Sequence, residues 1–577
     1  MLSLARFSFG EQASPERVSL DLGHRGSRGG PVATLPDGAM LWVCTEPEAP
    51  YLAREMWPIS RLTMRRSRDG GRSWSDPQVI VRGTRDYSVL SHALRLTRRG
   101  TLVHIYVRYS GYDYETASPA KSLCEAFCQR SSDGGRTWSA PEKLPAGERY
   151  IGDVLSIEQT RTGRLVYPFA FLTSTRGQFA VSVLYSDDDG RSWTRSKSVL
   201  EAGGSGFESG ASEPTVVELA DGRMLMLIRA QSGFLWRSFS TDQGKTWSAA
   251  EPSRLPASNS PATALRLRSG KIAVAWNLQV DGNYARQCLV LGITADGEEF
   301  ECLRELDGTD FPDHAAEPVQ HTTYAYLTER PDGWIAVSYN KGTWMRHNRP
   351  SLALAADDWL HASSETIDFS DGRTGWRSIN PGPNHLAAVE RYAAPGDDAP
   401  GASLELEQQK GIQAPAGISR NIPLVRDGEV RIALTVVRPE ACILLNDTLL
   451  TPGRIDEACL RIRFASEGGV FLAAGQPSRR ERDRRTTKYS YLSQAIGPET
   501  KYPAGFAAGR RMLLTVRYHA ASQTAQIAIG EGPALELPAL ELKTGRILGL
   551  SYLGLAAASG GVLRVRSIQI RRRTGRA

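Results

Sequence analysis

The stretch SRDGGRSW at residues 67–74 recurs with small changes along the chain and decides the fold. Further copies are SSDGGRTW at 131–138, SDDDGRSW at 186–193 and STDQGKTW at 240–247, and a degenerate fifth, TADGEEF, occupies 294–300. Their first residues lie 64, 55, 54 and 54 positions apart. Self-similarity at this period indicates stacked supersecondary units.

Each copy has the chemistry of a tight turn. An Asp side chain accepts hydrogen bonds from backbone N–H groups, and Gly supplies a positive φ angle. The Trp that ends each complete copy is expected to pack its ring between neighbouring units. The motif therefore predicts a structural clasp and not a catalytic site.

A second repeat runs out of phase with the first and consists of a turn glycine followed by an apolar strand. It occurs at Gly38, Gly100, Gly163, Gly222, Gly270 and Gly333. Alternating apolar residues flank these turns, as in a β-hairpin. Six hairpins, most of them followed by a further strand and a clasp, predict an all-β fold with a six-bladed β-propeller.

The length of 577 residues exceeds one ordinary domain, so at least two are expected. The propeller is predicted within residues 1–375, and residues 376–400, with their Pro and Gly clusters, predict a linker. Residues 401–577 alternate polar and apolar positions strand by strand. This pattern predicts a β-sandwich accessory domain of the jelly-roll or lectin kind.

Composition limits the function classes. A hydrophobic content of 41% and a charged content of 23% are typical of a soluble globular protein. The net charge of +7 gives weak support for an anionic ligand and none for nucleic acid. Seven scattered cysteines show neither a disulfide framework nor metal-ligand spacing, so no metal or other cofactor is expected.

No stretch is long enough to span a membrane, and the first residues lack the pattern of a signal peptide. A cytoplasmic location is expected, unless an export signal has been removed. The sequence makes no prediction about the oligomeric state.

Candidate site residues follow from counting along the hairpins. The residue about nine positions before each turn glycine should lie at the inner mouth of the first strand, and the residue seven or eight positions after it should face that mouth. These counts select Arg28, His92, Asp153, Glu213, Ser260 or Pro261, and Tyr324 before the turns, and Glu46, Arg108, Ala170, Arg229, Asn277 and Asn340 after them. So many polar mouth positions predict a binding site at the centre of the propeller.

The sharpest pair is Glu213 and Arg229, which lie nearly symmetrically about the turn at Gly222. Antiparallel pairing should therefore bring them close together. A structural salt bridge is the alternative explanation, because cross-strand charge pairs are common.

These features together resemble the sialidase (neuraminidase) superfamily of glycoside hydrolases over roughly residues 20–360. The resemblance rests on the four Asp-containing clasps, known as Asp boxes, on six blades, and on a Glu followed sixteen residues later by an Arg. Asp boxes also occur in other hydrolases, in lyases and in noncatalytic propellers.

The resemblance implies roles for particular residues. Three arginines would clamp a substrate carboxylate, and Arg28, Arg229 and Arg286 match them. A Tyr nucleophile would be activated by Glu213, and Tyr324 fits this nucleophile best, with Tyr326 as a weaker rival. The anomeric carbon of a sialic acid bears a carboxylate, which would repel a charged nucleophile. A neutral Tyr hydroxyl avoids that repulsion.

The family's general-acid Asp has no counterpart in its usual segment, because the only Asp between Arg28 and Ser67 is Asp37 in a hairpin turn. Glu55, on the loop before the strand at 62–65, is the first candidate to replace it, and Glu46 is the second. This departure leaves room for a related sugar acid or for a different reaction on a uronic-acid glycan.

Three mouth residues have no assigned role in the family scheme. Asp153 is expected to bind either a sugar hydroxyl or a mouth arginine. His92 is either a structural histidine or a ligand contact. Arg108 is retained as a candidate for substrate binding.

The leading hypothesis is a retaining exo-glycoside hydrolase that removes a terminal sialic acid or related carboxylated sugar from a glycan. A polysaccharide lyase or hydrolase acting on uronic-acid glycans is one alternative, because it would also need arginines around a carboxylate. A noncatalytic carbohydrate-binding propeller is the other.

Overall fold

The computed structural model describes most of the chain. The described residues are 6–7, 15–20, 22, 27–48, 58–174, 177–204, 209–279, 286–309, 320–343, 348–369, 375–378, 389–392, 403–407, 416–449, 458–481, 490–537, 540, 548–558 and 560–573. Within them the fold is almost entirely β, with one short α-helix, α1 (Asp357–Leu360), and one turn of 3-10 helix at Pro119–Lys121. None of the helices described is long and apolar enough to cross a membrane.

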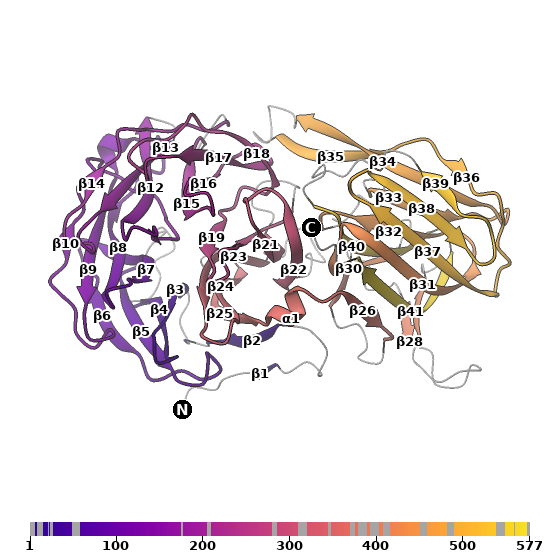
Figure 1. The fold of residues 1–577 in the computed structure, drawn as a ribbon, viewed down its shortest axis with the longest axis horizontal. Coiled ribbons are helices and arrows are strands. Elements are labelled where there is room, and N and C mark those ends of the chain that lie inside the picture. The colour runs from indigo at the N-terminus through magenta and orange to yellow at the C-terminus, as the bar shows by residue number, and fades with distance from the viewer. Residues whose placement is uncertain are drawn as a thin grey trace.

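Six antiparallel sheets form a six-bladed propeller, and Figure 1 shows them arranged in a ring. The first blade contains β3 (Arg28–Thr34), β4 (Met40–Pro47), β5 (Ser60–Ser67) and β6 (Gln78–Arg82), and the second contains β7 (Ser88–Leu96), β8 (Leu102–Gly111), β9 (Leu123–Ser131) and β10 (Glu142–Lys143). The third blade contains β11 (Glu158–Gln159), β12 (Leu165–Ser174), β13 (Gln178–Ser186) and β14 (Thr194–Arg195), and the fourth contains β15 (Ser212–Glu218), β16 (Met224–Arg229), β17 (Phe234–Ser240) and β18 (Glu251–Pro256). The fifth blade contains β19 (Thr263–Arg266), β20 (Ile272–Trp276), β21 (Cys288–Thr294) and β22 (Phe300–Gly308), and the sixth contains β23 (Gln320–Glu329), β24 (Ile335–Thr343) and β25 (Arg349–Ala355), extended by β2 (Glu16–Ser19) and β1 (Arg6–Phe7).

The first strand of each blade lies toward the centre of the ring, where β3 contacts β23 and β7, and β19 contacts β15 and β23. The ring is closed by the N-terminal strand, because β2 pairs with β25 in the sixth blade. The prediction of an all-β six-bladed propeller is confirmed.

The six hairpin turns take the conformation that their glycines predict. All six turn glycines have φ between 81° and 100°. A Cβ atom built on any of them would meet nothing within 4 Å. The requirement for glycine at these turns is therefore the left-handed backbone and not a lack of space.

The Asp boxes are clasps, as the sequence predicts. In the fourth box, Asp242 accepts hydrogen bonds from the Ser240 hydroxyl at 2.9 Å and from the N–H and hydroxyl of Thr246 at 2.9 and 2.6 Å. The indole of Trp247 donates to the carbonyl of Gly244 at 3.2 Å. The same Trp247 packs in a cluster that contains Val166 of the third blade and side chains of the fourth. Each box thus closes a local turn while its aromatic ring joins two blades.

Two sheets that follow the propeller form the predicted β-sandwich. One contains β26 (Ser364–Ile367), β28 (Val389–Tyr392), β29 (Leu404–Glu407), β31 (Asp427–Arg438), β37 (Arg511–His519), β38 (Thr524–Ile529), β39 (Leu535–Leu537) and β41 (Val562–Arg572). The other contains β27 (Trp376–Ser378), β30 (Ala416–Val425), β32 (Ala441–Asn446), β33 (Leu460–Phe464), β34 (Val470–Glu481), β35 (Ser490–Ile496), β36 (Thr500–Lys501) and β40 (Leu550–Ala557). A core of buried aliphatic and aromatic residues fills the space between the sheets.

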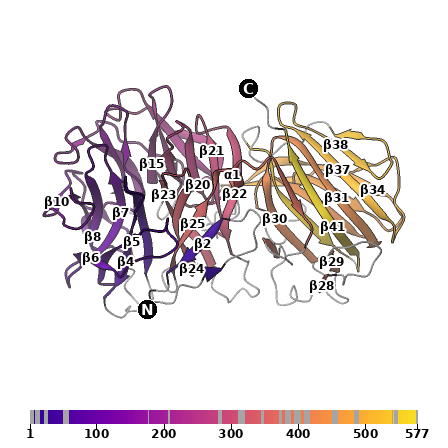
Figure 2. The ribbon, with the colours of Figure 1, turned by 60° about the horizontal axis from the view of Figure 1, so that its bottom comes forward.

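The sandwich takes strands from the segment that precedes its expected start at residue 401. Strand β26 pairs with β41, and β27 pairs with β30. Figures 1 and 2 both show the sandwich beside the propeller, next to β22 of the fifth blade. Strands β22 and β30 are in contact there.

Candidate active site

Irregularities in the innermost strands place the candidate residues at the centre of the ring. The pairing register shifts between Ser91 and Ala93 in β7, between Ser212 and Thr215 in β15, and between Thr323 and Tyr326 in β23. A bulge turns the residue it contains out of the regular ladder. The bulged residues include His92, Glu213 and Tyr324, and all three lie at the propeller mouth that the hairpin counts predicted.

Two of these bulged residues have unusual backbone angles. The φ angle of Glu213 is 41° and that of Tyr324 is 57°. Non-glycine residues in this region cost about 1–3 kcal/mol each and occur preferentially at functional sites.

The side chains of Tyr324 and Glu213 are joined. The Tyr324 hydroxyl donates to Glu213 Oε1 at 2.8 Å, and Arg229 Nη1 donates to Glu213 Oε2 at 2.5 Å. Tyr324 is 5% exposed, Glu213 7% and Arg229 8%. Burial raises the pKa of the Tyr324 hydroxyl, and the charge of Glu213 acts in the same direction, whereas Arg286 and Arg229 oppose it. A neutral Tyr is therefore held against a carboxylate that can accept its proton.

The other two candidate arginines flank the Tyr324 ring. The guanidinium carbon of Arg28 lies 4.7 Å from the ring centroid and that of Arg286 lies 5.4 Å from it. Both contacts lie within the range of a cation–π interaction. The structure thus brings all three arginines that the resemblance selected around one tyrosine.

Asn259 connects two of the arginines and was not selected from the sequence. Its side-chain oxygen accepts a hydrogen bond from Arg229 Nε at 2.7 Å, and its carbonyl accepts one from Arg286 Nη2, also at 2.7 Å. Asn259 lies about eleven residues before Gly270, just outside the window used for counting. A wider window would have included it.

Asp153 contacts Arg28, which is one of its two expected roles. The two terminal nitrogens of Arg28 donate to Asp153 Oδ2 at 3.4 and 3.5 Å. His92 Nε2 lies 3.5 Å from Asp153 Oδ1, and its Nδ1 lies 3.1 Å from the Tyr167 hydroxyl. Burial alone would raise the pKa of Asp153, but Arg28 and His92 lower it, and the net shift is downward. Asp153 is therefore an ionised partner that orients Arg28.

Glu46 and Arg108 have other partners. Glu46 is paired with Arg65 at 2.7 Å and with Arg61 at 3.1 Å. Burial opposes ionisation of Glu46, but Arg65 and a hydrogen bond from Thr63 bring its pKa below the ordinary value. The guanidinium of Arg108 lies 3.9 Å from the ring centroid of Phe127. Glu46 and Arg108 therefore contact side chains of the blades to which they themselves belong.

Two further candidates are placed as follows. The hydroxyl of Tyr326 donates to the carbonyl of Ser91 at 3.4 Å, so it has a different partner from Tyr324. Glu55 lies outside the described residues. The carboxylates of Glu213 and Asp153, which lie in the described cluster around Tyr324, each form an ion pair with an arginine.

Comparisons with known proteins agree with this architecture. Residues 59–337 match the family of BNR repeat-like domains. The chain is 27% identical over 419 residues to a sialidase from Micromonospora viridifaciens, an alignment that covers 68% of this chain and 59% of that protein. It is 24% identical over 288 residues to an anhydrosialidase from Macrobdella decora, covering 45% of this chain and 35% of that protein. The matched region therefore spans less than two thirds of the length of these curated relatives.

Among solved structures, the sialidase of Trypanosoma rangeli aligns over 99% of this chain and 97% of its own, at 13% identity and a TM-score of 0.45.

Proposed function

Because the chain belongs to the sialidase superfamily, we propose that it is a retaining exo-glycoside hydrolase that releases a terminal sialic acid or related carboxylated sugar from glycans. The observation that carries this proposal is the hydrogen bond of 2.8 Å from the Tyr324 hydroxyl to Glu213 Oε1. It joins a nucleophile to a base at a site surrounded by arginines.

The first step forms a covalent intermediate. As the Tyr324 oxygen attacks the anomeric carbon, its proton passes to Glu213, and the bond from that carbon to the leaving oxygen breaks. A second acid must protonate the leaving oxygen, and Glu55 is the sequence-based candidate for this role. Water then attacks the anomeric carbon and gives a proton to the carboxylate left by that second acid, while the bond to Tyr324 breaks and Glu213 returns its proton to the phenolic oxygen. Two displacements at one carbon retain its configuration.

The arginines supply binding and charge. Guanidinium groups bind carboxylates through two parallel hydrogen bonds and remain charged at all relevant pH values. Arg28, Arg229 and Arg286 surround the ring of Tyr324 or its base, so a carboxylate held by them would lie next to the nucleophile. Asp153 fixes Arg28, and Asn259 fixes the other two.

Hydrolysis of a panel of fluorogenic α-sialosides tests this proposal, with Tyr324→Phe as the informative variant and Tyr326→Phe as its matched control. Removal of a nucleophilic hydroxyl should reduce kcat at least about a thousandfold. Removal of the Tyr326 hydroxyl, which donates to a backbone carbonyl, should change kcat less than about tenfold.

Equal losses in the two variants would refute the assignment of the nucleophile. A product with ultraviolet absorption from a new double bond would instead indicate a lyase. Binding of a carboxylated sugar with no turnover of any substrate would indicate a noncatalytic propeller.

A further inference from the structure

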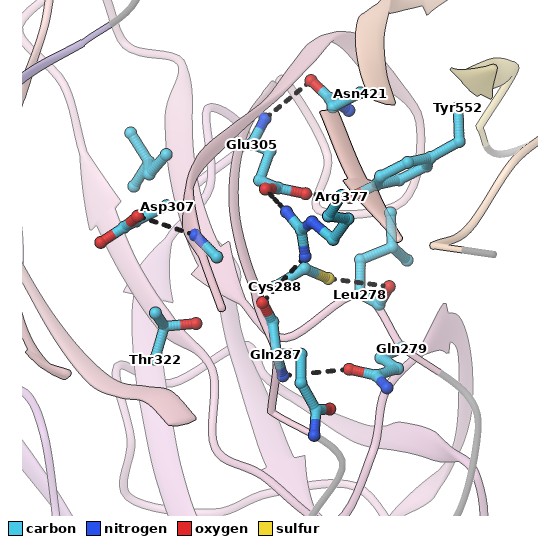
Figure 3. Close-up of polar contacts among 12 residues, drawn as sticks. Leu278, Gln279, Gln287, Cys288, Glu305, Asp307, Thr322, Arg377, Asn421 and Tyr552 are labelled. Carbon is cyan, nitrogen blue, oxygen red and sulfur yellow. Dashed lines mark hydrogen bonds and ion pairs between the residues drawn. The ribbon is translucent and has the colours of Figure 1, made fainter. Parts of the chain in front are cut away.

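An arginine of the sandwich reaches into the propeller beside a site residue. Arg377 lies on β27, which pairs with β30 within the sandwich. Its Nη1 donates to the carbonyl of Gln287 at 3.0 Å, and its Nη2 is ion-paired with Glu305 of β22 (Figure 3). Gln287 directly follows Arg286 in the chain. A side chain of one domain therefore holds the peptide next to a candidate arginine of the other.

The position of Arg377 is fixed from several sides. The residue is 8% exposed. Glu305, which pairs with it, also accepts a hydrogen bond from the Tyr552 hydroxyl at 2.9 Å, and its N–H donates to Asn421 Oδ1 at 3.0 Å. Tyr552 and Asn421 belong to β40 and β30 of the sandwich (Figure 3). The guanidinium and its carboxylate partner are thus oriented by side chains of the second domain.

The propeller leaves room for this guanidinium at Gly308. A Cβ atom at that position would lie 2.2 Å from Arg377 Nη2 and 2.6 Å from its guanidinium carbon. Any side chain at residue 308 would therefore push the guanidinium away from Gln287. Glycine at the end of β22 is required for the insertion.

Three main-chain atoms at Arg286 and Gln287 are hydrogen-bonded to neighbours: the Arg286 carbonyl, the Gln287 N–H and the Gln287 carbonyl. The Arg286 carbonyl accepts from the N–H and hydroxyl of Thr322 at 2.8 and 3.1 Å. The Gln287 N–H donates to Gln279 Oε1 at 3.1 Å, and the Gln287 carbonyl accepts from the Thr309 N–H at 2.9 Å as well as from Arg377. Arg377 adds to this set an anchor that the propeller itself does not supply.

We propose that Arg377 is a positioning residue that sets Arg286 in place for binding the substrate carboxylate, so that the sandwich completes the active site of the propeller. This inference rests on the proposed function, in which Arg286 contacts that carboxylate. A displacement of a binding group by about 1 Å is sufficient to reduce catalysis substantially. Loss of the Arg377 hydrogen bond would leave the Gln287 carbonyl with the Thr309 N–H as its one partner among the described residues, and this weaker anchoring would permit such a displacement of Arg286.

Two variants test this proposal by removing the hydrogen bond from Arg377 to the Gln287 carbonyl. One changes Arg377 itself, and the other changes Gly308 of the propeller. Arg377→Met deletes the guanidinium but leaves the partly buried Glu305 without this cation, so it also endangers folding. Gly308→Ala keeps every charge and displaces the end of a flexible side chain. Arg426→Ala is the matched control, because Arg426 makes an ion pair to Glu299 across the same interface at 3.0 Å and no described contact joins it to Gln287.

Calorimetry measures the affinity of each full-length variant for the unsaturated glycal analogue of sialic acid and for the methyl ester of that analogue. Gly308→Ala should weaken binding of the acid about tenfold and binding of the uncharged ester less than about twofold, because only the acid uses Arg286 fully. Arg426→Ala should leave both affinities unchanged.

A double-mutant cycle on kcat/KM for a fluorogenic sialoside completes the test. In an Arg286→Ala background, Gly308→Ala should cost less than about twofold, since the group it positions is absent. An equal loss with and without Arg286, or wild-type affinity of Gly308→Ala for the acid, would overturn the inference while leaving the proposed function intact. If the wild-type protein binds neither the glycal acid nor any sialoside, the proposed function and this inference both fail.

Discussion

At the propeller mouth, strained backbone angles and charge pairs occur in the same few residues. Glu213 and Tyr324 both have positive φ angles, and their side chains are bonded to each other. Arg28, whose guanidinium lies over the Tyr324 ring, is held by Asp153. The Tyr324 side chain is thus placed by its own backbone, and the charges around it are placed by neighbouring blades.

The first prediction concerns Asp153 and pH. Asp153→Asn keeps the shape of the side chain but removes the negative charge of Asp153 that faces Arg28, so the melting temperature at pH 7 should fall by a few degrees. The folded pKa of Asp153 lies below its unfolded value of about 3.9. Its stabilisation is therefore complete above that value and is lost as pH falls through the folded pKa. Thermal melts should show a gap between wild type and variant that narrows below about pH 4.

The exposed Asp76 provides the control for this series. Asp76→Asn should leave the melting temperature unchanged at each pH. A gap for Asp153→Asn that stays constant from pH 7 to about pH 3 would contradict the ionised pair.

Residue-level prediction from the sequence succeeded where the partners lie on one hairpin. Glu213 and Arg229 flank the same turn, so their proximity follows from strand pairing alone. The partnership of Asp153 with Arg28 joins residues 125 positions apart in different blades, and only the closed ring brings them together. Asn259 was not selected because counting back from a turn glycine locates the start of a strand only approximately.

At the scale of elements, the hairpin turns are regular, whereas several of the innermost strands contain shifts in their pairing register. The turn glycines and Asp boxes predict each hairpin from a local pattern of residues. The register shifts at Ser91–Ala93, Ser212–Thr215 and Thr323–Tyr326 have no such local signal. They depend on packing between blades, which is why the fold could be predicted and the orientation of the site residues could not.

The second prediction tests the structural role of the clasps. Asp242→Ala removes the acceptor for three hydrogen bonds within the fourth Asp box. The melting temperature should fall by a few degrees, while kcat/KM at 25 °C should remain within about twofold of wild type, because the box belongs to an outer turn. Differential scanning fluorimetry and initial rates measure the two quantities. A loss of kcat/KM greater than about tenfold in the folded variant would show that the box contributes to the site.

On the scale of the whole molecule, the propeller and the sandwich share an apolar cluster. Leu303 and Phe300 of the fifth blade belong to the same buried cluster as Leu424 and Tyr552 of the sandwich. An ion pair between Arg304 of the fifth blade and Glu365 of the sandwich also joins the two domains. These contacts could not be predicted from the sequence, because nothing in the repeats of one domain specifies which face of a blade the other domain covers.

The third prediction follows from this shared cluster. A truncated chain that ends at residue 363 would expose Phe300, Leu303 and their neighbours to water. Large exposed apolar patches promote association. The truncated protein should therefore aggregate or melt well below the full chain, as measured by size-exclusion chromatography and fluorimetry. A monomeric propeller with an unchanged melting temperature would show that the two domains are energetically independent.

The most direct test of the central claim is to identify the residue that becomes covalently bound to sugar. Brief incubation with a difluorinated sialic acid, whose fluorines slow release of the intermediate, is followed by proteolysis and mass spectrometry. We predict one glycosyl group on Tyr324 and no labelling of the Tyr324→Phe variant. Labelling of any other residue, or unchanged labelling of Tyr324→Phe, would contradict the account.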